Sequence, residues 1–190
     1  MVNTRWFSLD YLRSGTKEQV EVFQLLTDYR IFQILENYQP ILVGTIPIGI
    51  AVETSDLDVI CCVQDFDEFE RFNKANFEDY EGFSVIRRMV EGIERIKINF
   101  TLGRWPIEIF GQNKPTHMQN GFLHMVIEDR LLRLYGERFK DYIVQLKTNG
   151  LKTEPAFAKA LKLEGDPYLE LLKLSRWTDR ELEELWEEPK

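Results

Sequence analysis

Residues 42–59 read LVGTIPIGIAVETSDLDV, and this stretch decides the fold. A short apolar strand over residues 41–43 ends at Gly44 and Thr45. A turn that contains proline and glycine then leads to a second buried strand over residues 57–63. The stretch therefore predicts two strands of one sheet, joined by a loop that begins with a small residue.

Two aspartates mark the start of the second strand. Asp56 and Asp58 stand two positions apart, so the strand period of two places both carboxylates on one side, while the apolar residues between and after them point into the core. Convergent carboxylates repel each other unless a cation joins them, and oxygen ligands favour Mg²⁺ or Mn²⁺. Gly44 leaves backbone N–H groups open to a phosphate, and the Thr45 hydroxyl adds a donor. The stretch predicts a divalent metal beside a phosphate.

A third carboxylate stands alone in a later apolar strand. Residues 105–110 read WPIEIF, in which Glu108 faces opposite to the isoleucines on either side of it. On a strand next to the two aspartates, Glu108 would complete a site for one or two metal ions or accept the proton of an attacking hydroxyl. Lys97, on the polar face of an alternating strand, is placed to reach a phosphate, although a solvated strand face explains it equally well.

The surrounding sequence predicts a mixed sheet flanked by helices. Thr16 and Gln19 form a capping-box pattern at the start of a helix expected to run from Lys17 to about Tyr38, and Pro40 ends it. The further expected elements are a surface helix over residues 65–76 and strands over residues 83–90, 95–102 and 105–110.

From residue 116 onward the pattern is helical. Thr116 and Gln119 repeat the capping-box pattern ahead of an apolar helical repeat. The expected fold class is α+β, with a mixed sheet and its flanking helices over residues 1–113 and a helical region packed on them over residues 114–190. Later helix starts are expected at Glu154-Pro155, at Asp166-Pro167 and at Thr178 with Glu181.

Composition and charge narrow the class of protein. The chain has 190 residues, 44% of them hydrophobic, and carries a formal charge of -8. No window approaches the roughly 18 apolar residues of a membrane span, and the adjacent Cys61 and Cys62 suit reduced thiols, so we expect a cytoplasmic protein without a membrane partner. The negative charge opposes long polyanions, so no long nucleic acid is expected, and a small substrate fits better.

The order of these residues resembles a known pattern. A strand that ends in Gly44-Thr45, followed by Asp-Leu-Asp at residues 56–58 and by Glu108 in a later strand, is similar to the nucleotidyltransferase pattern of the DNA polymerase beta-like superfamily. Thr45 replaces the serine of the usual Gly-Ser signature. The chain as a whole, including GLKTEPAFAKALKLEGDPYLELL at residues 150–172, looks like a small bacterial family of unknown function within that superfamily.

The resemblance implies a nucleotidyltransferase-like mixed sheet and a metal-dependent reaction. A nucleoside monophosphate would pass from a nucleoside triphosphate (NTP) to a hydroxyl acceptor, a small molecule or a protein, with release of pyrophosphate. The expected cofactor is Mg²⁺ or Mn²⁺. The expected metal ligands and catalytic residues are Asp56, Asp58 and Glu108, and the expected nucleotide contacts are Gly44, Thr45, Ser55 and Lys97.

Other functions also fit the pattern. A non-catalytic module of the same fold, similar to the antitoxin halves of some toxin-antitoxin pairs, would bind nucleotide or protein without turnover. A nucleotide-sugar glycosyltransferase would use Asp-x-Asp as its metal clamp but would leave the Gly-Thr loop unexplained. Within the transferase hypothesis, the acidic composition favours cationic acceptors.

Several other polar residues are open to two interpretations. Arg87, Arg88 and Arg104 are candidate phosphate cations, although most arginines lie on an ordinary surface. His124 and Glu128 stand four apart on the expected helix, where they form either a proton-handling pair at the mouth of the site or a local side-chain pair. The sequence does not choose between these interpretations.

Overall fold

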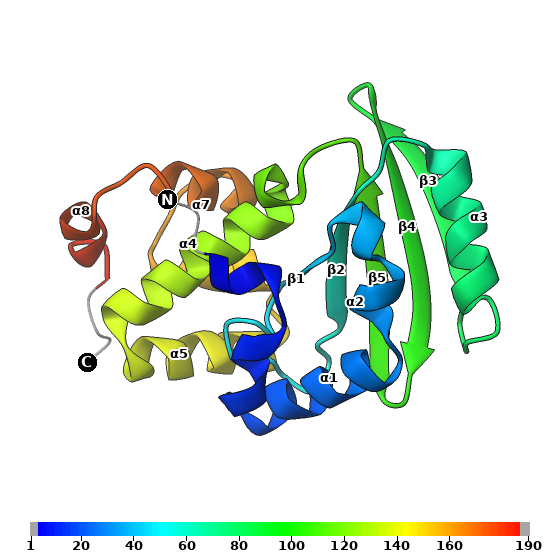
Figure 1. The fold of residues 1–190 in the computed structure, drawn as a ribbon. Coiled ribbons are helices and arrows are strands. Elements are labelled where there is room, and N and C mark those ends of the chain that lie inside the picture. Colours follow the sequence, from blue (N-terminus) through cyan, green and yellow to red (C-terminus); the bar gives the residue numbers. More distant parts are fainter. Residues whose placement is uncertain (1–3, 187–190) are drawn as a thin grey trace.

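A mixed sheet lies at the centre of the computed structural model, which describes residues 4–186 (Figure 1). Its strands are β1 (Ile41–Val43), β2 (Leu57–Cys62), β3 (Ser84–Val90), β4 (Ile93–Leu102) and β5 (Trp105–Gln112). They are ordered β1-β2-β5-β4-β3 across the sheet. Strand β2 runs parallel to β5, and the other neighbouring pairs are antiparallel. The expected α+β class with a mixed sheet is confirmed.

The two faces of the sheet differ because side chains alternate along each strand. Leu57, Ile98 and Ile109 point to one face, where their side chains are fully buried in an apolar cluster. Asp58 and Glu108 point to the opposite face and stay half-buried. The first face is covered by α1 (Lys17–Asp28), α2 (Ile31–Ile34) and α3 (Phe66–Phe77).

The expected continuous helix from Lys17 to Tyr38 is wrong. The capping box of Thr16 and Gln19 starts α1 as predicted, but the helix ends at Asp28 and Arg30 takes a left-handed conformation with φ 54°. In an unbroken helix Ile31 would lie about 140° around the axis from Leu26, because each residue turns by about 100°. The break lets both side chains enter the core, where they are 0% and 1% exposed.

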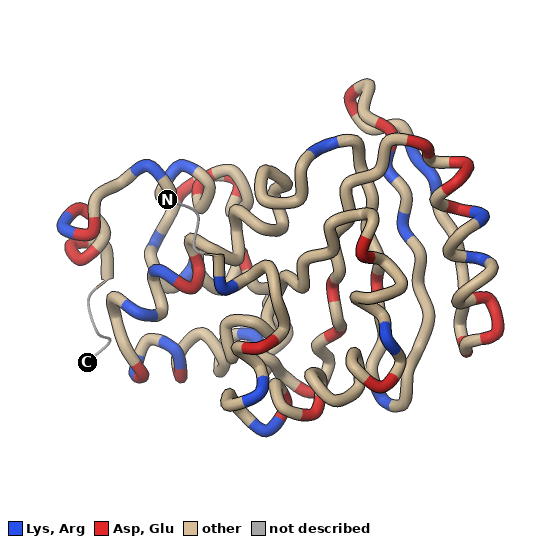
Figure 2. The backbone as a smooth tube through the Cα atoms, viewed as in Figure 1, with Lys and Arg blue, Asp and Glu red and all other residues tan. Residues whose placement is uncertain are grey.

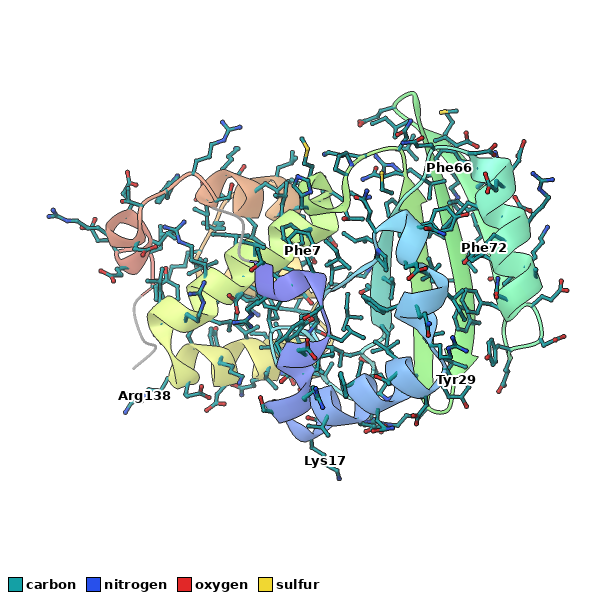
Figure 3. The ribbon with its side chains drawn as sticks, viewed as in Figure 1. Phe7, Lys17, Tyr29, Phe66, Phe72 and Arg138 are labelled. Carbon is teal, nitrogen blue, oxygen red and sulfur yellow. The ribbon has the colours of Figure 1, made fainter. Side chains whose placement is uncertain are left out.

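Helix α3 shows why the sheet is closed on this side. The Asp65 side chain caps its first turn by accepting a hydrogen bond from the Glu68 backbone N–H. Phe66, Phe69 and Phe72 then follow at a spacing of three, and these rings pack in the apolar cluster of the sheet; Figure 3 labels the first and last of them. The expected surface helix is confirmed, with bounds shifted by one residue.

The helices of the second half lie on the other side of β1 (Figure 1). They share a second apolar cluster that also includes Ile41 and Val43 of β1 and Trp6 of the 3₁₀ helix η1 (Thr4–Phe7). The predicted boundary at residue 113 stays a prediction. These helices are α4 (Asn120–Tyr135), α5 (Glu137–Thr148), α6 (Thr153–Ala160), α7 (Pro167–Leu174) and α8 (Asp179–Glu183).

The expected capping box of Thr116 and Gln119 is wrong. Thr116 belongs to the 3₁₀ helix η4 (Thr116–Met118), and α4 begins only after Gln119. The Gln119 amide instead donates hydrogen bonds to the backbone carbonyls of Cys61 and Lys114, each at 2.9 Å. The glutamine side chain therefore ties the start of α4 to β2 rather than capping a helix. The later starts of α6, α7 and α8 are confirmed.

None of the helices between residues 4 and 186 combines the length and the apolar composition that a membrane span requires.

Candidate functional site

A cleft of about 910 Å³ lies between the open face of the sheet and the helices of the second half. The sheet supplies most of its floor and the loop after β1 closes one end. Helices α4 to α7 supply the facing wall. The floor includes Gly44 and the polar and charged residues Thr45, Ser55, Asp56, Asp58, Arg95, Lys97 and Glu108, and those of the wall include His124, Glu128, Lys147, Glu154 and Tyr168.

The loop after β1 is folded back on itself by two hydroxyl groups. Ser55 Oγ accepts a hydrogen bond from the Val52 backbone N–H at 2.9 Å and lies 3.2 Å from the Thr45 hydroxyl. Gly44 adopts φ +80°, a left-handed conformation that glycine takes without a steric penalty. The structure therefore brings Gly44, Thr45 and Ser55, all expected nucleotide contacts, to one end of the cleft.

A side chain at Gly44 would collide with a carboxylate. A Cβ atom built there lies 2.8 Å from Asp58 Oδ2, so Gly44→Ala must displace the Asp58 side chain. We expect the variant to lose about 1–2 kcal/mol of stability from the left-handed backbone, together with most metal-dependent nucleotide binding. Thermal melts and titration calorimetry with MgATP measure both.

The matched control is Gly103→Ala. Gly103 also has a positive φ, +59°, but a Cβ there meets nothing within 4 Å. This control should lose similar stability and keep nucleotide binding. Equal binding by both variants would contradict a role for the open space beside Asp58.

The three expected catalytic carboxylates all line the floor of the cleft. Asp58 lies directly opposite Glu108 in the parallel pairing of β2 with β5, and Asp56 precedes β2 on the same side. Burial, together with the negative charges of Asp56 and Glu108, raises the pKa of Asp58 to about 7. These carboxylates are therefore close enough to repel one another, which a divalent cation would relieve.

Glu108 is paired with a lysine of the next strand. Lys97 Nζ lies 2.7 Å from Glu108 Oε2, and both side chains are partly exposed. Lys97 thus balances one of the negative charges on the floor. The pairing leaves Glu108 Oε1 without a hydrogen bond from any described residue.

The carboxylate oxygens are donors of the type that a hard divalent ion binds, but these side chains do not converge on one point. Within residues 4–186, no group of three His, Cys, Asp or Glu side chains is arranged to hold a metal ion. Two observations favour the fit: the register that pairs Asp58 with Glu108, and the open space that Gly44 leaves over Asp58. Oxygen donors of this type suit Mg²⁺ or Mn²⁺.

A buried lysine faces the carboxylates from the helical wall. Lys147, in the last turn of α5, is 7% exposed, and its ammonium group makes no hydrogen bond or ion pair with any residue between 4 and 186. Burial lowers its pKa to about 8 against the opposing charges of Glu128, Glu154, Asp56 and Asp58. An ammonium group without a protein partner is available for an anionic ligand in the cleft.

His124 is not the local partner of Glu128 that helical spacing suggested. Its Nδ1 atom lies 3.3 Å from Glu154 Oε1, and its Nε2 atom lies 2.9 Å from the Tyr168 carbonyl oxygen. Burial opposes the charge on His124, but these two contacts outweigh it and raise the pKa. His124 therefore links α4 to the starts of α6 and α7 and fixes the orientation of Glu154.

Glu128 is a buried carboxyl group with an unsatisfied oxygen. It is 2% exposed, and its Oε1 atom has no hydrogen-bond partner within the described part of the chain. Burial and, to a smaller extent, the charge of Glu154 raise the pKa of Glu128 to about 8, against the opposite effect of His124 and Lys147. At neutral pH the folded protein therefore holds Glu128 mainly as the neutral acid.

This shift predicts a pH-dependent effect of Glu128→Gln. The carboxyl group ionises near pH 4.5 in the unfolded chain but near pH 8 in the folded one, so its contribution to stability is present below pH 4.5 and is lost as the pH rises toward 8. Glutamine cannot ionise. We expect the variant to gain about 2 kcal/mol or more over the wild type between pH 5 and pH 8.

Melting temperatures of both proteins from pH 5 to pH 9 measure this gain. Glu137→Gln is the control, because the Glu137 side chain is 85% exposed on α5. A difference between Glu128→Gln and wild type that does not change with pH would contradict the shift.

Two of the candidate phosphate arginines lie away from the cleft. Arg87 pairs with Asp67 and Glu94 on the face covered by α3. Arg104 forms a two-pronged ion pair with Glu21, with both N–O distances at 2.7 Å. These arginines are engaged by protein carboxylates and do not contribute to the site.

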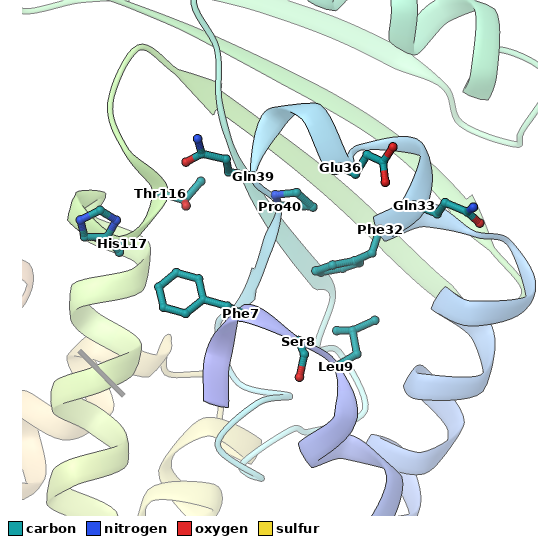
Figure 4. A pocket seen from close by; sticks show the side chains of 10 residues that line it. All are labelled: Phe7, Ser8, Leu9, Phe32, Gln33, Glu36, Gln39, Pro40, Thr116 and His117. Carbon is teal, nitrogen blue, oxygen red and sulfur yellow. The ribbon is translucent and has the colours of Figure 1, made fainter. Parts of the chain in front are cut away.

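A second groove, of about 670 Å³, lies between η1, α2 and η4 (Figure 4). Phe7, Phe32 and Pro40 make much of its surface, and Glu36 and His117 are its titratable residues. Its lining, drawn from the described residues, includes no lysine or arginine. The cleft over the sheet is therefore the better candidate for a phosphate or metal site.

Sequence reasoning named His124 and Glu128 as candidates at the mouth of the site but missed Lys147 and Glu154 of the helical wall. Lys147 and Glu154 belong to amphipathic helices in which a lysine and a glutamate are ordinary surface residues, and no spacing relates them to Asp58. One weak sequence signal points to Lys147: it is a charged residue on the apolar side of α5, next to Leu146.

Comparison with known proteins supports the fold. A family model described as a domain of unknown function (DUF4269) matches residues 24–174. No curated protein matches the chain. The chain is similar to solved structures of Cid1, described as an RNA terminal uridylyl transferase, with a TM-score of 0.52, 15% identity, and coverage of 88% of this chain and 52% of that one.

Two further structures give the same result. Cid1 poly(U) polymerase bound to MgATP has a TM-score of 0.51 and 15% identity, with coverage of 89% of this chain and 55% of that one. The GLD-2/RNP-8 complex has a TM-score of 0.50 and 13% identity, with coverage of 88% and 64%. This chain thus spans between half and two thirds of their length. At this identity the likeness shows a nucleotidyltransferase-like fold.

Proposed function

The chain belongs to the family of domains of unknown function DUF4269, and we propose that it transfers a nucleoside monophosphate from an NTP to a hydroxyl acceptor with release of pyrophosphate. The reaction uses Mg²⁺ or Mn²⁺. The proposed ligands of the metal are Asp56, Asp58 and Glu108. The observation that carries the proposal is the pairing of Asp58 with Glu108 across β2 and β5, beside the open space at Gly44.

The floor and the wall of the cleft have different roles in this reaction. The backbone N–H groups of the Gly44 loop, the Thr45 hydroxyl and the Ser55 hydroxyl bind the triphosphate at one end. Lys147 reaches the same phosphates from the helical wall as a point charge. A divalent ion held by these carboxylates would neutralise charge on the triphosphate and make the attacking hydroxyl easier to deprotonate.

Glu108 accepts the proton of the acceptor hydroxyl or ligates the metal through its free oxygen. Lys97, which holds the other oxygen, fixes the carboxylate and limits its repulsion from Asp58. Because the attacking and leaving oxygens of a phosphoryl transfer lie roughly in line, the protein mainly positions the two substrates. The MgATP complex of Cid1, a structure with the same fold, supports the proposal that the donor substrate is an NTP.

Titration calorimetry with ATP, GTP, CTP and UTP, with and without Mg²⁺ or Mn²⁺, tests the first step. Pyrophosphate release across a panel of hydroxyl acceptors tests the second. We expect metal-dependent binding of at least one NTP and acceptor-dependent release of pyrophosphate. Binding without release for any acceptor would contradict transfer and favour a binding module, and no binding at all would contradict both.

A further inference from the structure

The cleft continues beyond Glu108 along the open face of the sheet. Asn99 lies opposite Glu108 in the pairing of β4 with β5, and Lys97 and Arg95 follow on the same face, with Arg95 opposite Gln112. Four residues of a strand separate Asn99 from Arg95, which is about 14 Å. The cleft therefore has room on this side for a second ligand next to the carboxylates.

Arg95 is the most unusual residue of this extension. It is half-buried, and its Nε atom is buried without a hydrogen-bond partner in the described part of the chain. No carboxylate between residues 4 and 186 forms an ion pair with its guanidinium group, whereas Arg87 and Arg104 are both paired. An unpartnered guanidinium in a cleft is ready for a planar or tetrahedral anion.

Two other cations lie near Arg95: the exposed Arg88 and the cleft residue Lys114. Arg88 of β3 lies directly opposite Arg95, and side chains of opposite residues point to the same face. Lys114, two residues after Gln112, also lines the cleft. Figure 2 shows these basic segments on β3 and β4, next to the acidic segments of β2 and β5. Glu91, in the turn before β4, is the acidic residue that lines this end.

This grouping is unfavourable unless an anion occupies it. Like charges directly opposite each other on neighbouring strands destabilise a sheet, and here neither arginine has a carboxylate partner among the described residues. A phosphate group would satisfy both arginines and the buried Nε atom. The local charge is thus the reverse of the formal net charge of -8, which alone favours a cationic acceptor.

The order of the strands indicates which of the two substrates carries the anionic group that binds at Arg95. The phosphate loop lies at β1, the aspartates at β2, Glu108 at β5, and Arg95 at β4. If the triphosphate occupies the β1 end, as the proposed function requires, an in-line reaction brings the acceptor from the opposite side, over β5 and β4. The ligand at Arg95 is then the acceptor.

We propose that Arg95, with Arg88 and Lys114 beside it, forms a subsite for a phosphate group of the acceptor, which is a small hydroxyl compound that carries a phosphate. The inference rests on the proposed function for the identity of this ligand as the acceptor. The hydroxyl lies at Glu108 and the phosphate at Arg95. The separation of the two residues suits a compound of the size of a sugar phosphate or a mononucleotide.

Matched pairs of probes test the subsite without turnover. Titration calorimetry compares ribose with ribose 5-phosphate, and adenosine with adenosine 5′-phosphate, in the presence of Mg²⁺ and without NTP. We expect the phosphorylated member of each pair to bind more tightly, and Arg95→Gln to weaken that binding by at least about tenfold. Arg104→Gln, which removes an equal charge outside the cleft, should leave it unchanged.

The outcomes separate this inference from the proposed function. Equal binding within each pair, or equal effects of Arg95→Gln and Arg104→Gln, would overturn the subsite even if pyrophosphate release is observed with another acceptor. Phosphate-dependent binding that is lost in Arg95→Gln supports the subsite even where no transfer follows, and then it is the transferase proposal that fails. Stronger binding of an oligoribonucleotide than of any small probe would overturn the proposal that the acceptor is a small molecule.

Discussion

Asp58→Asn is expected to reduce nucleotidyl transfer by at least about a thousandfold while leaving the protein folded. The loss follows from the removal of one charged oxygen from the proposed ligands of the divalent ion, since the charge stabilisation that a metal supplies is worth several kcal/mol and about 4 kcal/mol corresponds to a thousandfold in rate. Asp56→Asn should have a similar effect. Pyrophosphate release and Mn²⁺ binding measure the two parts of the prediction.

The stability of Asp58→Asn provides an internal check. Because burial and the neighbouring carboxylates raise the pKa of Asp58 to about 7, its ionisation destabilises the metal-free protein above neutral pH, and asparagine removes that repulsion. The melting temperature of the metal-free variant at pH 8 should therefore equal or exceed that of the wild type. Glu53→Gln, an exposed change in the same loop, is the control for activity. Full activity in Asp58→Asn would show that Asp58 has no role in catalysis.

Lys147→Met is expected to weaken binding of nucleoside triphosphates by about 10- to 100-fold, which is the range for a hydrogen bond to a charged group. The buried ammonium group has no protein partner among the described residues, so its loss leaves no protein carboxylate newly unpaired, and methionine fills a similar volume. Binding of the nucleoside without phosphates should be unchanged. Titration calorimetry with ATP and adenosine measures both.

Lys140→Met is the matched control for this prediction. Lys140 stands on the same helix, with a side chain 28% exposed and close to Glu137. The Lys140→Met variant should bind ATP with the affinity of the wild type. Equal ATP affinity in Lys147→Met and wild type would show that the helical wall does not reach the triphosphate.

The floor of the cleft was predictable from the sequence because its residues obey local rules. The strand period of two puts Asp58 and Glu108 on the same face, and their neighbours are apolar enough to fix both strands in the sheet. The parallel pairing that sets the two residues side by side is a long-range contact, which the resemblance to a known pattern implied and the periodicity alone did not.

Most of the wall of the cleft was not predictable, because its residues come together only through contacts between different helices. Lys147 and Glu154 reach the site only through the packing of α4 on β1, of α5 and α7 on α4, and of α6 on α5 and α7, and such contacts leave no mark on the spacing of residues within one helix. The same holds for Arg88 and Arg95. As a run of sequence, Arg87-Arg88 looks uniform, yet the strand turns one side chain to α3 and the other to the open face.

The two apolar clusters also set an order of events during synthesis. The cluster under α1 to α3 uses residues between Leu12 and Ile109, so it is complete once the sheet has been made. The other cluster joins Trp6 to residues as late as Leu182. Since a chain is made from its N-terminus, η1 can pack on β1 early, but its cluster is complete only after the last helices have been made. The facing wall of the cleft is therefore assembled last, and a nascent chain released early would have the carboxylates in place but neither Lys147 nor a closed cleft to hold a substrate.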